Sequence, residues 1–196
     1  MSLVSNLFLL FVAAGVIVYY LVPAKWQWLV LLAFSYIYYI AGGIRYVGFL
    51  LFSTFVTWLT ALAIEKMETA GKHKTARKFV ILGLVLNFGM LGLVKYTNFA
   101  IENLNALFHM NLRGMQILLP LGISFYTFQS SGYILDVYWK RCKAEHHPLK
   151  YALFVSFFPQ ILQGPIGRYS RLAHQLYEHH KFESANITRG LERILW

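Results

Sequence analysis

Trp26 to Ile64, WQWLVLLAFSYIYYIAGGIRYVGFLLFSTFVTWLTALAI, holds a single Asp, Glu, Lys or Arg, which is Arg45. A helix needs about 20 consecutive apolar residues to cross the roughly 30 Å hydrocarbon core of a bilayer. The stretch is long enough for two such helices, Trp26 to Ile44 and Tyr46 to Ile64. It therefore predicts a helical protein that is embedded in a membrane.

The composition of the whole chain supports this prediction. Hydrophobic residues make up 58% of the sequence, aromatic residues 17% and charged residues only 13%, against about 25% charged in ordinary soluble domains. A soluble fold of this size needs more polar surface than this chain offers. Lipid is therefore the expected solvent for most of the chain.

Three further segments have the character of membrane spans. Leu3 to Val22 and Gly114 to Leu135 lack Asp, Glu, Lys and Arg, and Phe79 to Val94 is a shorter apolar run that resumes after Lys95. A lysine near a helix end reaches the interface with its long side chain, so Phe79 to Val94 is also expected to cross the membrane, as a fifth span. The predicted fold class is all-α, a polytopic transmembrane helical protein with about five spans.

Tyr151 to Gly167 is also uncharged, but it contains Pro159, Gly164 and Pro165. Proline removes a backbone donor and disrupts a helix interior. Broken backbone is tolerated at membrane depth only beside protein or water. We therefore predict a sixth, broken or re-entrant element here.

The net charge of +10 does not indicate nucleic-acid binding, because the basic residues lie between apolar segments. Loops near Lys25, from Glu65 to Lys78 and from Lys140 to Lys150 carry most of them. By the positive-inside rule these loops are cytoplasmic, which places the N-terminus and the connection from Tyr96 to Arg113 outside. The single Cys142 is then expected to be a reduced, unmodified thiol.

Motifs of soluble enzymes, such as a phosphate-binding glycine loop or His-Glu-x-x-His, are absent from the sequence. Leu119 to Trp139, LPLGISFYTFQSSGYILDVYW, places many hydrogen-bonding side chains in one span, which is expected to face inward. The alternative is that these groups only join helices. Asp136 is expected to pair with Lys140, four residues further along the same helix.

Phe154 to Leu172, FVSFFPQILQGPIGRYSRL, contains the broken element. Gln160 and Gln163 either bind a polar substrate or satisfy the freed backbone. Arg168 either holds a phosphate or marks the cytoplasmic boundary. All seven histidines lie in charged or loop-like surroundings, so we predict neither a general base nor a metal site from them.

These two stretches resemble the membrane-bound O-acyltransferase family, in the bacterial branch that modifies alginate and teichoic acid. The closing RGLERILW, Arg189 to Trp196, is similar to that branch too. The resemblance implies that residues 1–196 are a single membrane domain and the N-terminal part of a longer chain, with a partial fold of this family around a tunnel.

The resemblance also implies an activity. An acyl group, most simply acetyl, passes from a cytoplasmic thioester donor, either acetyl-CoA or an acyl carrier protein, toward an exported polysaccharide or a partner acyltransferase. The family's catalytic histidine lies in Trp-His motifs expected beyond Trp196, so no catalytic residue is assigned here and no bound cofactor or metal is expected. By motif match, Gln160, Gly164, Pro165 and Arg168 line the substrate path.

The expected location is the bacterial inner membrane, with multiple spans, the lipid bilayer as surroundings and no nucleic-acid partner. Two alternatives stay open. One is D-alanyl transfer to teichoic acid within the same family. The other is a non-enzymatic transporter or scaffold, which also needs inward polar groups and a broken helix.

Overall fold

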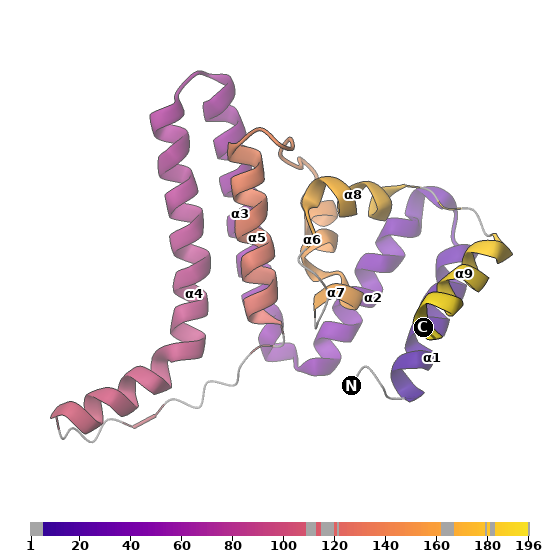
Figure 1. The fold of residues 1–196 in the computed structure, drawn as a ribbon, viewed down its shortest axis with the longest axis horizontal. Helices are drawn as coiled ribbons and strands as arrows, with labels where there is room; N and C mark the ends of the chain where they lie inside the picture. The colour runs from indigo at the N-terminus through magenta and orange to yellow at the C-terminus, as the bar shows by residue number, and fades with distance from the viewer. Residues whose placement is uncertain are drawn as a thin grey trace.

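The computed structural model describes residues 6–108, 113–114, 120, 122–161, 167–178, 180 and 183–195, and this part of the chain is all-helical (Figure 1). The prediction of an all-α fold is confirmed for it. Short 3₁₀ turns at Ala24–Trp26 and Ile44–Tyr46 join the first three helices. The helices are α1 Asn6–Leu21, α2 Gln27–Gly42, α3 Val47–Thr69, α4 His73–Phe108, α5 Ile123–Tyr138, α6 Pro148–Ser156, α7 Phe158–Ile161, α8 Tyr169–Tyr177 and α9 Ser184–Leu195.

The first three helices lie close to the segments expected from the sequence. α2 ends at Gly42, and the next residue, Gly43, has a φ of 139°, a backbone conformation that residues with a Cβ rarely adopt. A Cβ at Gly43 would also lie 2.7 Å from the ring of Tyr46. Glycine therefore allows the chain to turn directly from α2 into α3.

The fourth helix differs from its prediction. The connection expected from Tyr96 to Arg113 is helical as far as Phe108, because Lys95 to Phe108 contains neither glycine nor proline to end the helix. Figure 1 shows that α4 bends sharply before its end. The Thr97 hydroxyl donates to the carbonyl of Leu93, and such a bond from threonine to the preceding turn favours a bend.

Two helices of the described chain, Ile44–Thr69 and His73–Phe108, are long and apolar enough to cross a membrane, by length and composition. Asn6–Leu21 is apolar but shorter. The span expected from Gly114 to Leu135 is helical only from Ile123 onward in the described residues, after Gly122 at φ 70°. The count of five spans therefore stays a prediction.

A tight core forms where α3, α4 and α5 pack together. A Cβ at Gly83 of α4 would lie 2.8 Å from Ile134 Cδ1 of α5 and 3.0 Å from Thr60 Oγ1 of α3. Because Gly83 has no side chain, α3, α4 and α5 can pack closely together at this point. Asn87, one turn further along α4, is fully buried and receives a hydrogen bond of 2.5 Å from the hydroxyl of Ser53.

The second half of the chain packs against the first through α2 and α3. α6 lies on both of these helices, and α8 returns beside the start of α6, where the Tyr177 hydroxyl donates to the Lys150 carbonyl at 2.6 Å. The connections α1–α2, α3–α4 and α5–α6 lie at one end of the molecule (Figure 1). The three basic loops expected on one side of the membrane therefore share one end.

Candidate functional site

The polar face of α5 points into the protein. Thr127, Gln129, Ser130 and Ser131 are all buried, which confirms the expectation that this helix faces inward. Part of this face has a structural role only. Ser131 donates to the Thr127 carbonyl of its own helix at 2.7 Å, and Ser130 accepts from the Tyr151 hydroxyl of α6 at 3.4 Å. The functional interest therefore lies with the side chains that reach toward the broken element.

The broken element interrupts its helix at Phe157, whose ψ of 107° ends α6. In an unbroken helix the Phe158 N–H would donate to the Phe154 carbonyl. Gln129 Nε2 of α5 donates to that carbonyl instead, at 3.1 Å, and the Ser35 hydroxyl of α2 accepts the Phe158 N–H at 3.3 Å. Two neighbouring helices thus take the two freed backbone groups.

This arrangement refines two sequence predictions. The interruption begins two residues before Pro159, which lies at the start of the short α7. Proline has no backbone N–H, but at a helix start no N–H is needed for a bond within the helix. Freed backbone at the break is satisfied by Gln129 and Ser35 rather than by Gln160. Gln163, Gly164 and Pro165 lie outside the described residues.

Several polar atoms around this break are buried without a hydrogen-bond partner among the described residues. They come from α5, α6 and α7: Thr127 Oγ1, Gln129 Oε1, Ser156 Oγ and Gln160 Oε1. Leaving such an atom unpaired costs about 1–3 kcal/mol. Unpaired polar atoms from three neighbouring elements therefore suit a place where a polar ligand passes.

A polar pocket of about 550 Å³ lies where α7 meets α8. It brings together Gln160 and Arg168, two of the four site residues predicted from the sequence. Gly167 lies beside Gln160, since a Cβ there would lie 3.4 Å from Gln160 Oε1, an ordinary van der Waals distance. The pocket therefore supports the expectation that these two residues act in one place.

Arg171 and Gln175 also line this polar pocket, and sequence reasoning missed both. A signal was present, because Arg168, Arg171 and Gln175 follow one another at the three- and four-residue spacing that places side chains on one helical face. Their positions give the pocket two guanidinium groups and two amide side chains. Such a set of donors suits an anionic or strongly polar ligand.

Glu145, in the α5–α6 connection, fixes the start of α8 beside this pocket. Its Oε2 accepts from the Tyr169 hydroxyl at 2.8 Å, its N–H donates to the Tyr133 hydroxyl at 2.8 Å, and its carbonyl accepts from Trp58 Nε1 at 2.8 Å. Burial raises the pKa of Tyr169 far above its usual range, so this hydroxyl keeps its proton and remains a donor. Because Tyr169 follows Arg168 directly, the Glu145 contacts hold the arginine's backbone in place.

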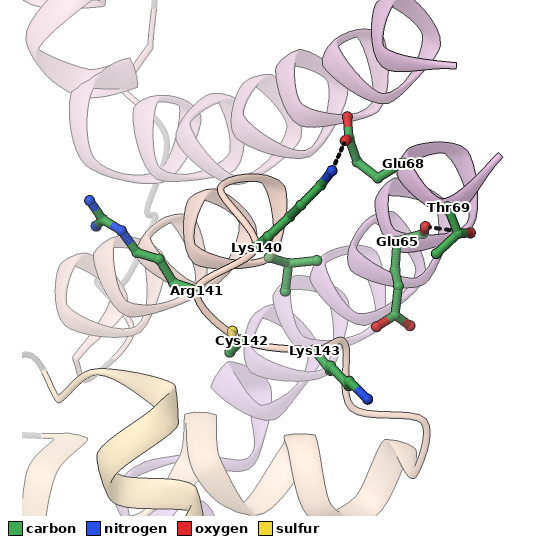
Figure 2. Close-up of a pocket in the computed structure, with 8 residues that line it drawn as sticks. Glu65, Glu68, Thr69, Lys140, Arg141, Cys142 and Lys143 are labelled. Atoms are coloured by element: carbon green, nitrogen blue, oxygen red, sulfur yellow. Dashed lines mark hydrogen bonds and ion pairs between the residues drawn. The ribbon is translucent and has the colours of Figure 1, made fainter. Parts of the chain in front are cut away.

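A second pocket, of about 570 Å³, lies at the end of α3 beside the α5–α6 connection (Figure 2). Here Lys140 pairs with Glu68 at 3.2 Å, while Arg141 pairs with Asp136 at 3.5 Å. The expected pair of Asp136 with Lys140 was wrong. α5 ends at Tyr138 and Lys140 has a φ of 58°, so the helical spacing on which the pair depended does not extend to Lys140.

Cys142 lines this second pocket as a free thiol. Burial raises its pKa to about 12, with smaller contributions from Asp136 and Glu65. A thiol that stays protonated at neutral pH is a poor nucleophile. The expectation of an unmodified cysteine stays a prediction. The contacts of Lys140 with Glu68 and of the Ala144 N–H with Glu65 join α3 to the α5–α6 connection here.

Two of the described histidines pair with carboxylates of α3 at the protein surface. His73 lies 2.8 Å from Glu68, and His146 lies 3.2 Å from Glu65. Within the described residues, no three side chains of the kinds that bind metals come together. These histidines therefore serve as surface partners of α3.

The fold and these sites are those of a helical membrane protein, and comparison with known proteins defines it further. The chain is 36% identical to the probable alginate O-acetylase AlgI of Pseudomonas aeruginosa, over 97% of this chain and 37% of that protein. It is 34% identical to the AlgI of Azotobacter vinelandii, over 97% of this chain and 39% of that protein. It is 31% identical to the peptidoglycan O-acetyltransferase of Helicobacter pylori, over 84% of this chain and 35% of that protein.

These relatives are members of the membrane-bound O-acyltransferase family, and the chain is related to that family over most of its length, as its two motifs indicated. The chain spans a little over a third of the length of these relatives. No family model matches the chain, and no solved structure matches it.

Proposed function

We propose that the protein is an O-acyltransferase that moves an acetyl group from a cytoplasmic thioester donor toward an exported polysaccharide. The observation that carries this proposal is the identity of 36% to an alginate O-acetylase, over 97% of the chain. The relatives compared above are named for O-acetyl transfer to alginate or to peptidoglycan. Acetyl is therefore favoured over D-alanyl as the transferred group.

The arrangement in the membrane follows from charge and hydrogen bonding. We propose about five spans in a single domain of the inner membrane, with the N-terminus outside and the basic end in the cytoplasm. α6 and α7 would form a re-entrant element, entered and left from the cytoplasm. The bonds of Tyr177 to Lys150 and of Tyr169 to Glu145 support this, since they hold both ends of α8 near the start of α6.

We propose that Gln160, Gly164, Pro165 and Arg168 line the path of the substrate. Support comes from the polar pocket shared by Gln160 and Arg168 and from the unpaired polar atoms beside it. Arg168 would contact a phosphate of the donor, which is either acetyl-CoA or an acyl carrier protein. Attack of a hydroxyl on a thioester is faster by about 10²- to 10⁴-fold with a general base. We propose that this base is a histidine outside residues 1–196.

The decisive experiment expresses the protein, as its gene encodes it, in a bacterium that lacks its own polysaccharide O-acetylase. The exported polymer is isolated and treated with mild base. Release of acetate above the empty-vector level is the expected result. Release of D-alanine would favour teichoic acid as acceptor, and release of neither, with the protein present in the membrane, would favour a transporter or scaffold.

The role of Arg168 is tested by the variant Arg168→Gln, which keeps the length and polarity of the side chain but removes its charge. The expected result is a KM for the donor raised about tenfold with a smaller change in kcat, since a charge-assisted bond is lost. Arg77→Gln is the matched control, because Arg77 is an exposed arginine of α4 that does not line the polar pocket. An unchanged donor KM in Arg168→Gln would exclude this contact.

A further inference from the structure

An apolar groove adjoins the polar pocket of α7 and α8. It has a volume of about 550 Å³ and lies between α1, α2, α8 and α9. Its lining is mostly apolar, with Val12, Val16, Leu31, Phe34 and Phe158 among it, and His180, Asn186 and Gly190 line its other side. We call it the α1–α2 groove. Leu172 and Gln175 line both this groove and the polar pocket, so the two spaces meet on the same face of α8.

The groove lies beside a loosely packed helix. None of the residues of α1 is buried, although Phe11 makes ring contacts with Phe34 at 5.1 Å and with Phe158 at 5.5 Å. Leu10, Ile17 and Leu21 are exposed on α1. In a bilayer these side chains face lipid tails, and a tail can enter the groove beside them without crossing water.

Positive charge lies at the polar end of this combined space. Arg171 follows Arg168 by nearly one turn of α8, and Gln175 follows Arg171 by one turn and reaches the groove. No acidic side chain lines either the polar pocket or the groove among the described residues. Basic pockets beside membrane helices at the cytoplasmic side bind anionic lipid headgroups.

We propose that this combined site binds an anionic phospholipid, with its phosphate at Arg171 and one acyl chain in the α1–α2 groove. The charge at one end and the apolar lining at the other match the two halves of such a lipid. A soluble phosphate compound would use the arginine but leave the groove unfilled. The inference goes beyond acyl transfer, because lipid binding does not depend on the reaction.

The test uses the protein as its gene encodes it, purified in detergent and stripped of lipid. Phosphatidylglycerol or phosphatidylcholine is added in steps, and binding is followed by native mass spectrometry and by the rise in unfolding temperature. Phosphatidylglycerol is expected to bind more tightly. Arg171→Gln should weaken it about fivefold, the effect of about 1 kcal/mol for one basic residue at an anionic surface, while Arg77→Gln should leave it unchanged.

A second variant tests the apolar half of the site. Val16→Trp fills the groove without changing charge and is expected to lower the affinity for both lipids, whereas Val18→Trp, which lies on α1 but does not line the groove, should not. Equal binding of the two lipids, or normal binding by Arg171→Gln, would overturn the proposal. Undiminished binding of phosphatidylglycerol by Val16→Trp would show that no acyl chain occupies the groove and would overturn the proposal too, whatever the acetyl-transfer assay shows.

Discussion

Two polar regions lie inside this protein, and they differ in how their hydrogen bonds are made. Between α3 and α4, the Asn87 amide donates to Thr57 Oγ1 at 3.0 Å and to the Gly83 carbonyl at 2.9 Å, and it accepts from Ser53. Around the broken element, Gln129 and Gln160 each keep an oxygen without a partner among the described residues. Polar residues in a membrane helix thus serve packing in the first region and are available to a ligand in the second.

The largest effect on stability and activity is expected from a substitution at the contact between Gly122 and Ile161, beside the broken element. Gly122 has a φ of 70°, and a Cβ there would lie 2.3 Å from the Ile161 carbonyl oxygen. Gly122→Ala should lower the free energy of unfolding by about 3 kcal/mol, from left-handed strain and overpacking, and should reduce acetyl transfer as α7 shifts. Thermal unfolding in detergent and an acetyl-transfer assay measure the two effects.

Gly132→Ala is the matched control for this variant, because a Cβ at Gly132 of α5 meets nothing within 4 Å. Replacing a helical glycine by alanine in open space is neutral or stabilises by up to about 1 kcal/mol. If Gly122→Ala behaved like Gly132→Ala, the close contact between α5 and α7 would not be a constraint.

The next effect separates stability from activity. Asn87→Leu removes three hydrogen bonds from the first region, which at about 0.6 kcal/mol each in a membrane should cost about 2 kcal/mol of unfolding free energy. Acetyl transfer per folded molecule should not change. Asn103→Leu is the control, since Asn103 is exposed and its bond among the described residues is to the Phe99 carbonyl of its own helix. A loss of specific activity in Asn87→Leu alone would mean that the two regions are coupled.

A smaller effect is expected at the start of α8. Tyr169→Phe removes the bond to the Glu145 carboxylate and should cost about 1.5 kcal/mol, the lower range for a bond to a charged group. Because Arg168 precedes Tyr169, the donor KM should rise while kcat changes less. Glu145→Gln keeps an oxygen that can accept from the Tyr169 hydroxyl, so its donor KM should rise less than that of Tyr169→Phe. An equal rise of the donor KM in the two variants would instead point to the charge of Glu145.

The smallest effect concerns the ion pairs at the basic end. Lys140→Ala and Lys140→Gly both remove the exposed pair with Glu68, but only glycine relieves the φ of 58°. Lys140→Gly should therefore be more stable than Lys140→Ala by about 1 kcal/mol. Thermal unfolding of the two variants checks this, and equal stability would mean that the φ of Lys140 is not a source of strain.

The sequence predicted the helices well where apolar length alone decides them. α1, α2 and α3 lie within a few residues of the uncharged segments, and the inward face of α5 followed from its serines, threonine and glutamine. The extension of α4 to Phe108 was missed, because Lys95 and Glu102 look like a loop between spans although nothing in that stretch ends a helix. Charge pattern indicates the membrane boundary, and a helix need not stop there.

The site was predicted only in part, for a different physical reason. Gln160 and Arg168 were identified from the motif, and the pocket that they share includes Arg171 and Gln175. The partners of the broken backbone, Ser35 and Gln129, belong to helices far away in sequence, so no local pattern names them. Pairings of this kind depend on how the helices assemble.

The break at Phe157 also has a consequence for how the chain is made. Its freed carbonyl and amide are bound by Gln129 of α5 and Ser35 of α2, and both helices precede it in the chain. During synthesis, the helices that satisfy the break therefore leave the ribosome before α6 and α7 do. The interrupted segment can then pack against Gln129 and Ser35 as it folds, and it avoids the free-energy cost of placing unpaired peptide groups in lipid.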